Sequence, residues 1–362
     1  MKNHATLVLF LFFVLAGTIA GAGEPLVMLA NPLQGTDSTP EFSHGNTHPE
    51  IALPFPMNAW APYTEPQDNS FFYQYRDHKF YGLRQTHEPS VWIRDHATFS
   101  LMPVSGQLVV DEKARASDFR HETETAEPAY YRVHLDTWGV TAEVTPTERA
   151  ARLRFTFEKP ADSYVILDVF KSGKPCSIEI IPSENKIIGI ARNNSGAVPD
   201  NFGNYFVVVF DRPFSAYGIW TKDGVQKGVT KAEGPHVGAY LQFDTQANPV
   251  VECKTASSFI SAAQASLNLN QEIGNASFDE IRHRAEGIWN DALGRVQLEG
   301  GSDEQRRTFY SALYRSILFP HRFYEMDQAG QPVHYSPYDG TVHPGVMFTD
   351  SGYWDTFRSA HP

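Results

Sequence analysis

Residues 130–136 read YYRVHLD, in which Tyr131, Val133 and Leu135 alternate with polar side chains. The same period of two continues in VTAEVT at 140–145 and in RLRFTFE at 152–158. Alternation of this kind is typical of β-strands that have one buried face and one solvated face. We therefore interpret all three runs as strands of a sheet that covers a hydrophobic core.

Further runs of strand length extend this pattern from about Gly106 to Cys253, at 164–170, 187–191, 205–210, 216–220 and 237–243. Gly, Pro, Asn or Asp clusters separate most of the runs, and no helical pattern comes between them. So many short strands need a second sheet to cover the first. The sequence therefore predicts a β-sandwich, mainly antiparallel, as an N-terminal domain over residues 23–255.

The pattern then changes to a helical period. Residues 277–280 read SFDE, a capping box in which Ser277 and Glu280 satisfy each other's backbone amides. The apolar side chains behind it fall on one helix face: Phe278, Ile281, Ala285, Ile288, Trp289, Ala292 and Leu293. A second helix is expected to start at Ser302-Asp303 and to point Phe309, Leu313 and Ile317 inward, and 258–269 is expected to be a further helix.

Two or three helices cannot enclose a core of their own. We therefore assign residues 256–300 to a helical linker and 301–362 to the incomplete start of a helical domain. The chain is interpreted as a fragment whose helical domain continues beyond Pro362.

Composition narrows the class of protein. The chain has 362 residues, of which 41% are apolar, enough for two domains. Its 42 acidic and 30 basic side chains leave a net charge of −12, which argues against a nucleic-acid partner.

The first residues look like an export signal. An apolar run at 7–15 is followed by Ala20-Gly21-Ala22, so residues 1–22 are predicted to be a signal peptide of a secreted or periplasmic protein. The alternative is a retained N-terminal anchor. After signal cleavage no membrane association is expected. Export would permit a disulfide between Cys176 and Cys253, but two free buried thiols are an equal alternative.

A candidate ligand site lies in HEPSVWIRDH at residues 87–96. Trp92 sits in a turn flanked by Pro, Ser and charges, where its flat face could stack on a sugar ring. Arg84 and Asp95 nearby are candidate hydrogen-bonding partners. The alternative is a buried structural tryptophan. The spacing of His87, Asp95 and His96 matches no reliable metal-ligand pattern.

A second candidate site is SGYWDTFR at residues 351–358. Asp355 lies between Trp354 and Thr356, with Arg358 three residues on, which could form a polar cluster in an aromatic pocket. Carboxylates bind pairs of sugar hydroxyls well because each oxygen accepts more than one donor. The alternative is an Asp355–Arg358 ion pair at a helix start.

Taken in order, the short motifs resemble glycoside hydrolase family 92. They are NPLQGT at 31–36, GNTHP at 45–49, PFPM at 54–57, LMP at 101–103, FYSALY at 309–314 and WDTFR at 354–358. Each motif is modest alone, but the ordered set runs from Asn31 to Arg358. Pro56 stands where the family usually has Gly, and His48 where an aromatic is common.

The resemblance implies an exo-acting, calcium-dependent, inverting α-mannosidase with a β-sandwich followed by an (α/α)6 domain. It carries Trp92 over as a platform beside the leaving-group sugar and Asp355 as a ligand of the terminal mannose. The catalytic acid, the catalytic base and the Ca²⁺ ligands would lie beyond residue 362, with no metal site inside the chain. The fragment itself is therefore expected to be inactive, and its partners are mannose-containing oligosaccharides or glycoproteins.

Two other functions stay open. One is a secreted carbohydrate-binding β-sandwich without catalysis, and the other is a glucosidase or glycoside phosphorylase of similar architecture. Wide apolar helix faces, which a free-standing module would leave exposed, argue against the first. The Trp92 loop slightly favours α-1,2-linked mannose of N-glycans or mannans.

Overall fold

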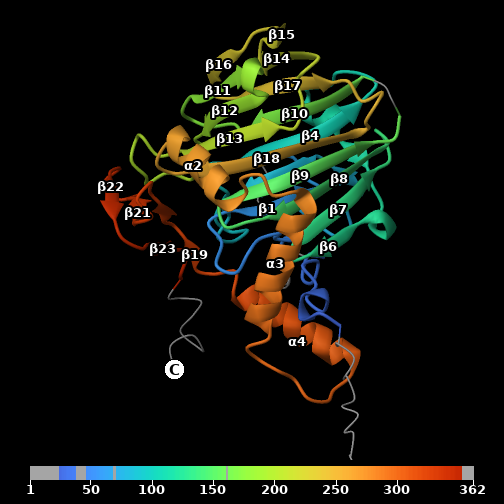
Figure 1. Cartoon of the computed structure of the whole chain (residues 1–362), viewed down its shortest axis with the longest axis vertical. Helices are drawn as coiled ribbons and strands as arrows, with labels where there is room; N and C mark the ends of the chain where they lie inside the picture. The colour runs from blue at the N-terminus through green and yellow to red at the C-terminus, as the bar shows by residue number, and fades with distance from the viewer. Residues whose placement is uncertain (1–23, 38–45, 68–70, 160–161, 353–362) are drawn as a thin grey trace, which may run out of the picture.

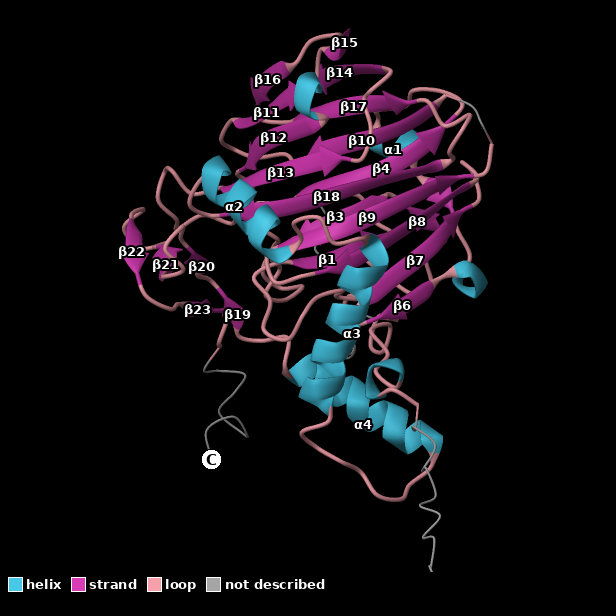
Figure 2. Ribbon diagram, in the orientation of Figure 1, coloured by secondary structure: helices cyan, strands magenta, loops and turns pink. Residues whose placement is uncertain are grey.

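Two large antiparallel sheets make up most of the protein (Figures 1 and 2). The computed structural model describes residues 24–37, 46–67, 71–159 and 162–352. The sheets stack face to face, and the three longest helices follow them in the chain. A β-sandwich is therefore confirmed as the N-terminal architecture.

The seven-stranded sheet has the order β1-β3-β4-β10-β17-β14-β15. Its strands are β1 (Ala59–Tyr63), β3 (Gly82–Thr86), β4 (Phe99–Ser105), β10 (Ser163–Val169), β14 (Ala216–Thr221), β15 (Gly224–Lys227) and β17 (Val237–Phe243). Strands β1, β3 and β4 lie before Gly106, where no alternation predicted them. All residues of β1 and β3 are buried, because Phe72, Tyr73 and Phe170 cover the outer face of the sheet. A strand buried on both faces has no period of two.

The nine-stranded sheet has the order β16-β11-β12-β13-β18-β9-β8-β7-β6. Its strands are β6 (Thr125–Glu127), β7 (Tyr130–Leu135), β8 (Val140–Pro146), β9 (Ala150–Phe157), β11 (Cys176–Ile181), β12 (Lys186–Ala191), β13 (Asn204–Phe210), β16 (Lys231–Gly234) and β18 (Val250–Ser258). The three alternating runs that predicted strands are β7, β8 and β9, which pair in sequence. Their apolar side chains face the core.

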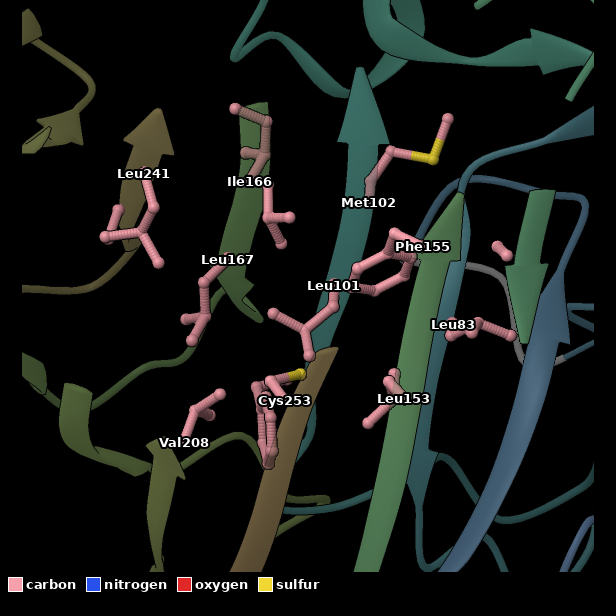
Figure 3. Packing of buried hydrophobic residues seen from close by; sticks show 14 of the residues in the cluster. Leu83, Leu101, Met102, Leu153, Phe155, Ile166, Leu167, Val208, Leu241 and Cys253 are labelled. Carbon is pink, nitrogen blue, oxygen red and sulfur yellow. The ribbon is translucent and has the colours of Figure 1, made fainter. Parts of the chain in front are cut away.

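The core lies between the two sheets (Figure 3). Leu101 and Leu167 from one sheet meet Leu153, Val208 and Cys253 from the other, and all are fully or almost fully buried. Cys176 and Cys253 are both free and buried. Of the two alternatives for these cysteines, the structure therefore has the separate thiols.

Three helices follow the sandwich: α2 (Ala262–Glu272), α3 (Phe278–Leu293) and α4 (Asp303–Ser316). The capping box predicted at Ser277 is present, and Ser302 forms a second one with Gln305. Helix α2 packs on β18 and β13 of the nine-stranded sheet. Its start lies four residues later than expected, because Ser261 and not Ser258 caps it through the Gln264 amide.

The N-terminal segment 24–37 packs against α3 and α4. Val27 and Leu29 belong to the same hydrophobic cluster as Trp289 of α3. Trp289 is fully buried, and its indole N–H donates to the carbonyl of Ala52 at 2.7 Å. Ile288, which the helical pattern placed on the same face as Trp289, lies outside the buried face of α3, with 43% of its side chain exposed. The neighbouring Trp289 takes the buried position on the helix, so Ile288 is rotated towards solvent.

The remaining elements are short. They are η1 (Leu26–Met28), η2 (His121–Thr123), η3 (Pro182–Glu184), α1 (Glu112–Arg115), β2 (Lys79–Phe80), β5 (Ser117–Asp118), β19 (His321–Arg322), β20 (Glu325–Met326), β21 (Pro332–Tyr335), β22 (Val342–Pro344) and β23 (Phe348–Thr349). Strands β19 to β23 form two small sheets beside one end of the sandwich (Figure 1). Among the described residues, none of the helices is long and apolar enough to cross a membrane.

Candidate functional site

The loop that joins β3 to β4, residues 87–98, forms the candidate site. Strands β3 and β4 pair through Leu83 and Leu101, so the loop leaves and re-enters the same end of the sheet. Within it, Ser90 and Ile93 form an isolated bridge that closes a tight turn. The turn carries Trp92 to the tip of the loop.

Trp92 is 63% exposed. Its backbone amide donates to Ser90 Oγ at 3.2 Å, and its ring lies nearly perpendicular to that of Phe71, with a centroid distance of 5.5 Å. The alternative of a buried structural tryptophan is therefore wrong. The open face of Trp92 is available for stacking, although its predicted role beside a leaving-group sugar stays a prediction.

Asp95 holds the loop together from inside. Its Oδ1 accepts from the backbone amides of His87 at 2.9 Å and His96 at 2.8 Å, and its Oδ2 accepts from the Arg84 guanidinium. Burial alone would raise the pKa of Asp95, but Arg84 and the two histidines outweigh burial and lower it to about 2. Asp95 is therefore ionised and fully engaged at neutral pH.

Arg84 is also buried, with 1% of its side chain exposed. Its guanidinium lies 3.8 Å from the Phe72 ring centroid and 4.9 Å from that of Phe170. The structure thus brings the two predicted site residues Arg84 and Asp95 together as an ion pair. Among the described residues, the Arg84 Nε and Nη1 atoms have no hydrogen-bond partner.

Glu88 is a site residue that the sequence did not single out. It is 1% exposed, and neither of its carboxyl oxygens has a hydrogen-bond partner in the described part of the chain. Burial, followed by repulsion from Asp95, raises the pKa of Glu88 to about 10. Its carboxyl group is therefore neutral at pH 7. An acid between His and Pro carries no sequence signal of burial, which is why it was missed.

A cavity of about 670 Å³ lies beside the loop. Arg84, Glu88, Arg94 and Asp95 line it from the loop side, and the rest of its wall is mostly polar: Pro66, Gln67, Glu112, Lys113, Phe170, Lys171, Ser172, Gly173, Asn193, Asn194 and His236. Its volume is within the range of small-ligand sites, about 300–1,000 Å³. The cavity thus has the size and polar groups to bind a hydroxyl-rich ligand.

A buried histidine group lies at the base of the loop. The rings of His87 and His96 are 5.2 Å apart, and His87 Nδ1 lies 2.9 Å from the carbonyl of His96. Burial lowers the pKa of both histidines, that of His87 to about 3. Nearby, His321 Nδ1 lies 2.8 Å from Asp350 Oδ2, which links the loop environment to the segment that precedes the second predicted site.

The second predicted site lies outside the described residues. Trp354, Asp355 and Arg358 belong to residues 353–362, so neither the sugar-binding role nor the ion-pair alternative is tested. Across the described ranges, no group of three or more His, Cys, Asp or Glu side chains could hold a metal ion.

Family models place this architecture among the glycosidases. Residues 29–258 match the N-terminal domain of glycosyl hydrolase family 92, and residues 264–362 match the family's catalytic domain. These two matches cover most of the chain. The protein belongs to glycosyl hydrolase family 92.

Solved structures and a curated relative agree with this assignment. An inverting mannosidase of family GH92 from Bacteroides thetaiotaomicron VPI-5482 is 45% identical, with a TM-score of 0.90 over 93% of this chain and 46% of that one. A GH92 α-mannosidase from the same bacterium, solved with mannoimidazole, is 25% identical, with a TM-score of 0.81 over 94% and 46%. An "uncharacterized secreted glycosidase" of Arthroderma benhamiae is 27% identical over 76% of this chain and 40% of its own length. The chain spans less than half the length of each.

Proposed function

We propose that the protein is part of a secreted, calcium-dependent, inverting exo-α-mannosidase that removes terminal α-linked mannose from N-glycans or mannans. The observation that carries the proposal is the similarity to the inverting mannosidase, which is 45% identical with a TM-score of 0.90. The mannoimidazole complex of the second Bacteroides enzyme supports mannose-containing substrates.

The loop geometry suits sugar binding. Trp92 offers an exposed aromatic face, and the rigid Arg84–Asp95 pair fixes the loop that carries it. A stacking face on a rigid loop can orient a neutral sugar without attracting charged ligands. Preference for α-1,2 linkages is part of the proposal.

The chemistry needs a carboxylic acid and a separate carboxylate that activates water from the opposite face. Asp95 cannot act as the base, because backbone amides and Arg84 occupy its oxygens. We place the acid, the base and the Ca²⁺ ligands C-terminal to residue 362, so the fragment itself is inactive. The greater length of the relatives supports this placement.

Mannose release by the complete protein tests the proposal. The substrates are α-1,2-, α-1,3- and α-1,6-mannobiose, and proton NMR follows the first product, which is β-mannose if the anomeric centre inverts. Chelation with EGTA should abolish release, and added Ca²⁺ should restore it. The secreted protein should begin near Gly23, which N-terminal sequencing checks.

Two outcomes would reject the proposal in different ways. Binding of mannobioses without release of mannose would indicate a non-catalytic carbohydrate-binding protein. Release that requires inorganic phosphate and yields mannose 1-phosphate would indicate a phosphorylase.

A further inference from the structure

Glu88 is unusual among the buried carboxyl groups around the loop. Asp95 accepts two backbone amides and an arginine, whereas neither oxygen of Glu88 has a partner within the described ranges. A buried polar group without hydrogen bonds costs about 1–3 kcal/mol of stability. A binding site can contain such an unsatisfied group, because a bound ligand supplies the missing hydrogen-bond partners.

Arg84, on the same cavity wall, also has polar atoms without hydrogen-bond partners. Its Nε and Nη1 atoms have no acceptor in the described part of the chain, while another nitrogen, Nη2, donates to Asp95. Phe72 and Phe170 contact the guanidinium and hold it in place. Two residues that line the cavity therefore have unused hydrogen-bonding capacity: Arg84 has two nitrogens without an acceptor, and Glu88 has a carboxyl group that can both donate and accept.

The Arg84–Asp95 pair and Glu88 favour a neutral ligand group at their part of the wall, while Arg94, Lys113, Lys171 and Glu112 line the rest of the cavity. The Asp95 carboxylate neutralises Arg84 at contact distance, so the pair attracts an anion weakly. With a pKa of about 10, Glu88 is uncharged at neutral pH. Hydroxyl groups donate and accept at once, which matches a neutral carboxyl group beside free N–H groups.

The same geometry argues for binding and against bond cleavage at this cavity. Asp95 has no free oxygen to activate water, and Glu88 holds its proton too tightly to be an efficient general acid near pH 7. Neither carboxyl group is therefore suited to bond cleavage, which favours a binding role for this wall of the cavity.

We propose that Glu88 and Arg84 bind adjacent hydroxyl groups of a sugar unit beyond the terminal mannose, which makes the cavity beside the β3–β4 loop a determinant of oligosaccharide specificity. The inference rests on the proposed mannosidase function. It adds a binding site that the Trp92 and Asp355 assignments do not include.

The test compares Glu88→Leu and Glu88→Gln in the complete protein on two substrates. Mannotriose places further sugars beyond the scissile bond, whereas 4-nitrophenyl α-mannoside has the terminal mannose alone. Glu88→Leu should raise KM for mannotriose about tenfold, the effect of one lost hydrogen bond, and should change KM for the aryl mannoside much less. Glu88→Gln keeps a donor and an acceptor and should retain most of the affinity for mannotriose.

Stability provides a second readout, because a buried carboxyl group without partners should be destabilising. Glu88→Leu should raise the melting temperature, whereas Glu122→Leu, a control at an exposed carboxyl group on η2, should change neither stability nor KM. Equal KM changes on both substrates, or none on mannotriose, would overturn the inference. If Glu88→Leu does not fold, the test uses the wild-type protein and mannotrioses that each lack one hydroxyl on the second or third sugar. The inference is overturned if every one of these mannotrioses binds as tightly as mannotriose itself.

Failure of the proposed function gives a different result. If the wild-type protein releases no mannose, calorimetry with mannotriose and maltotriose replaces kinetics. Binding that Glu88→Leu abolishes and Glu88→Gln keeps supports the cavity as a sugar site independently of hydrolysis. Absence of binding by either trisaccharide rejects both proposals.

Discussion

At the scale of single residues, Arg84, Glu88 and Asp95 differ in how far their polar atoms are satisfied. Asp95 is an ionised carboxylate inside the protein, and it ties both ends of the β3–β4 loop to Arg84. Glu88, seven positions earlier on the same loop, is neutral and has no partner in the described part of the chain. The structure therefore separates a loop-holding acid from a candidate ligand-binding acid.

Asp95→Asn should destabilise the protein by about 3–5 kcal/mol, because it leaves the buried Arg84 charge without a counter-ion. Urea unfolding measures the change. The matched control is Asp136→Asn, whose partner Arg120 is 61% exposed, and which should have little effect because surface ion pairs contribute little. Similar losses for the two variants would contradict a structural role for Asp95.

Asp355→Ala in the complete protein should lower kcat/KM for α-mannosides by roughly ten- to a hundredfold, because a charge-assisted hydrogen bond to the terminal mannose strengthens in the transition state. Trp92→Phe keeps a flat aromatic face and should have a smaller effect that depends on the leaving group. Kinetics on an aryl mannoside and a mannobiose check both, with melting curves to confirm folding. Near-wild-type activity of Asp355→Ala would favour the ion pair with Arg358.

At the scale of elements, the helices after the sandwich depend on defined starts and on one buried face. Helix α3 begins with the Ser277–Glu280 capping box and buries Ile281, Ala285 and Trp289. The N-terminal segment covers Ala285 and Trp289 through Val27 and Leu29, whereas Ile281 packs with helix α2 and the nine-stranded sheet. Segments far apart in sequence therefore stabilise the junction of sandwich and helices together.

Ser277→Ala should reduce the free energy of unfolding by about 1 kcal/mol, because the amide at Glu280 loses its acceptor. Thermal and urea unfolding of the complete protein would show it as a small, reproducible shift. Ser183→Ala, at an exposed position in η3, is the matched control. A loss no larger than that of the control would mean that the cap contributes nothing measurable.

At the scale of the whole molecule, Glu325 joins three parts of the fold. Its carboxyl oxygens accept from Ser258 Oγ at 2.9 Å, the Phe259 amide at 3.0 Å and Asn268 Nδ2 at 2.7 Å. Strand β20 is thereby tied to the end of β18 and to helix α2. Burial raises the pKa of Glu325 to about 7, although these donors oppose the rise.

This raised pKa predicts how stability changes with pH. Between the ordinary value of 4.5 and about 7 the native state binds more protons than the unfolded state, so stability falls as pH rises. The free energy of unfolding of Glu325→Gln minus that of the wild type should therefore increase by about 2–3 kcal/mol from pH 5 to pH 8. Urea unfolding at both pH values measures the difference between variant and wild type, which isolates Glu325 from other titrating groups. A pH-independent difference would contradict the prediction.

The sequence predicts those strands and helices that have one buried face and one face exposed to solvent. Strands β7, β8 and β9 and the caps at Ser277 and Ser302 were predictable, because alternation and capping are local patterns that reflect which side chains meet water. The ordered motifs from Asn31 to Arg358 also identified the family. Strands β1 and β3 were not predictable, because distant segments cover their outer face. The outward side chain of Ile288 was not predictable either, because the neighbouring Trp289 takes the buried position on α3.

Only the tertiary structure decided the chemical state of the candidate site. The sequence around Arg84, Glu88 and Asp95 shows only that they are polar residues. It does not indicate that all three are buried on one cavity wall. Whether a carboxyl group is charged depends on its desolvation and on the charges that other segments bring near it. The sequence therefore determined the sandwich, the helix starts and the family, while the fold decided that Asp95 is an ionised anchor and Glu88 a neutral acid.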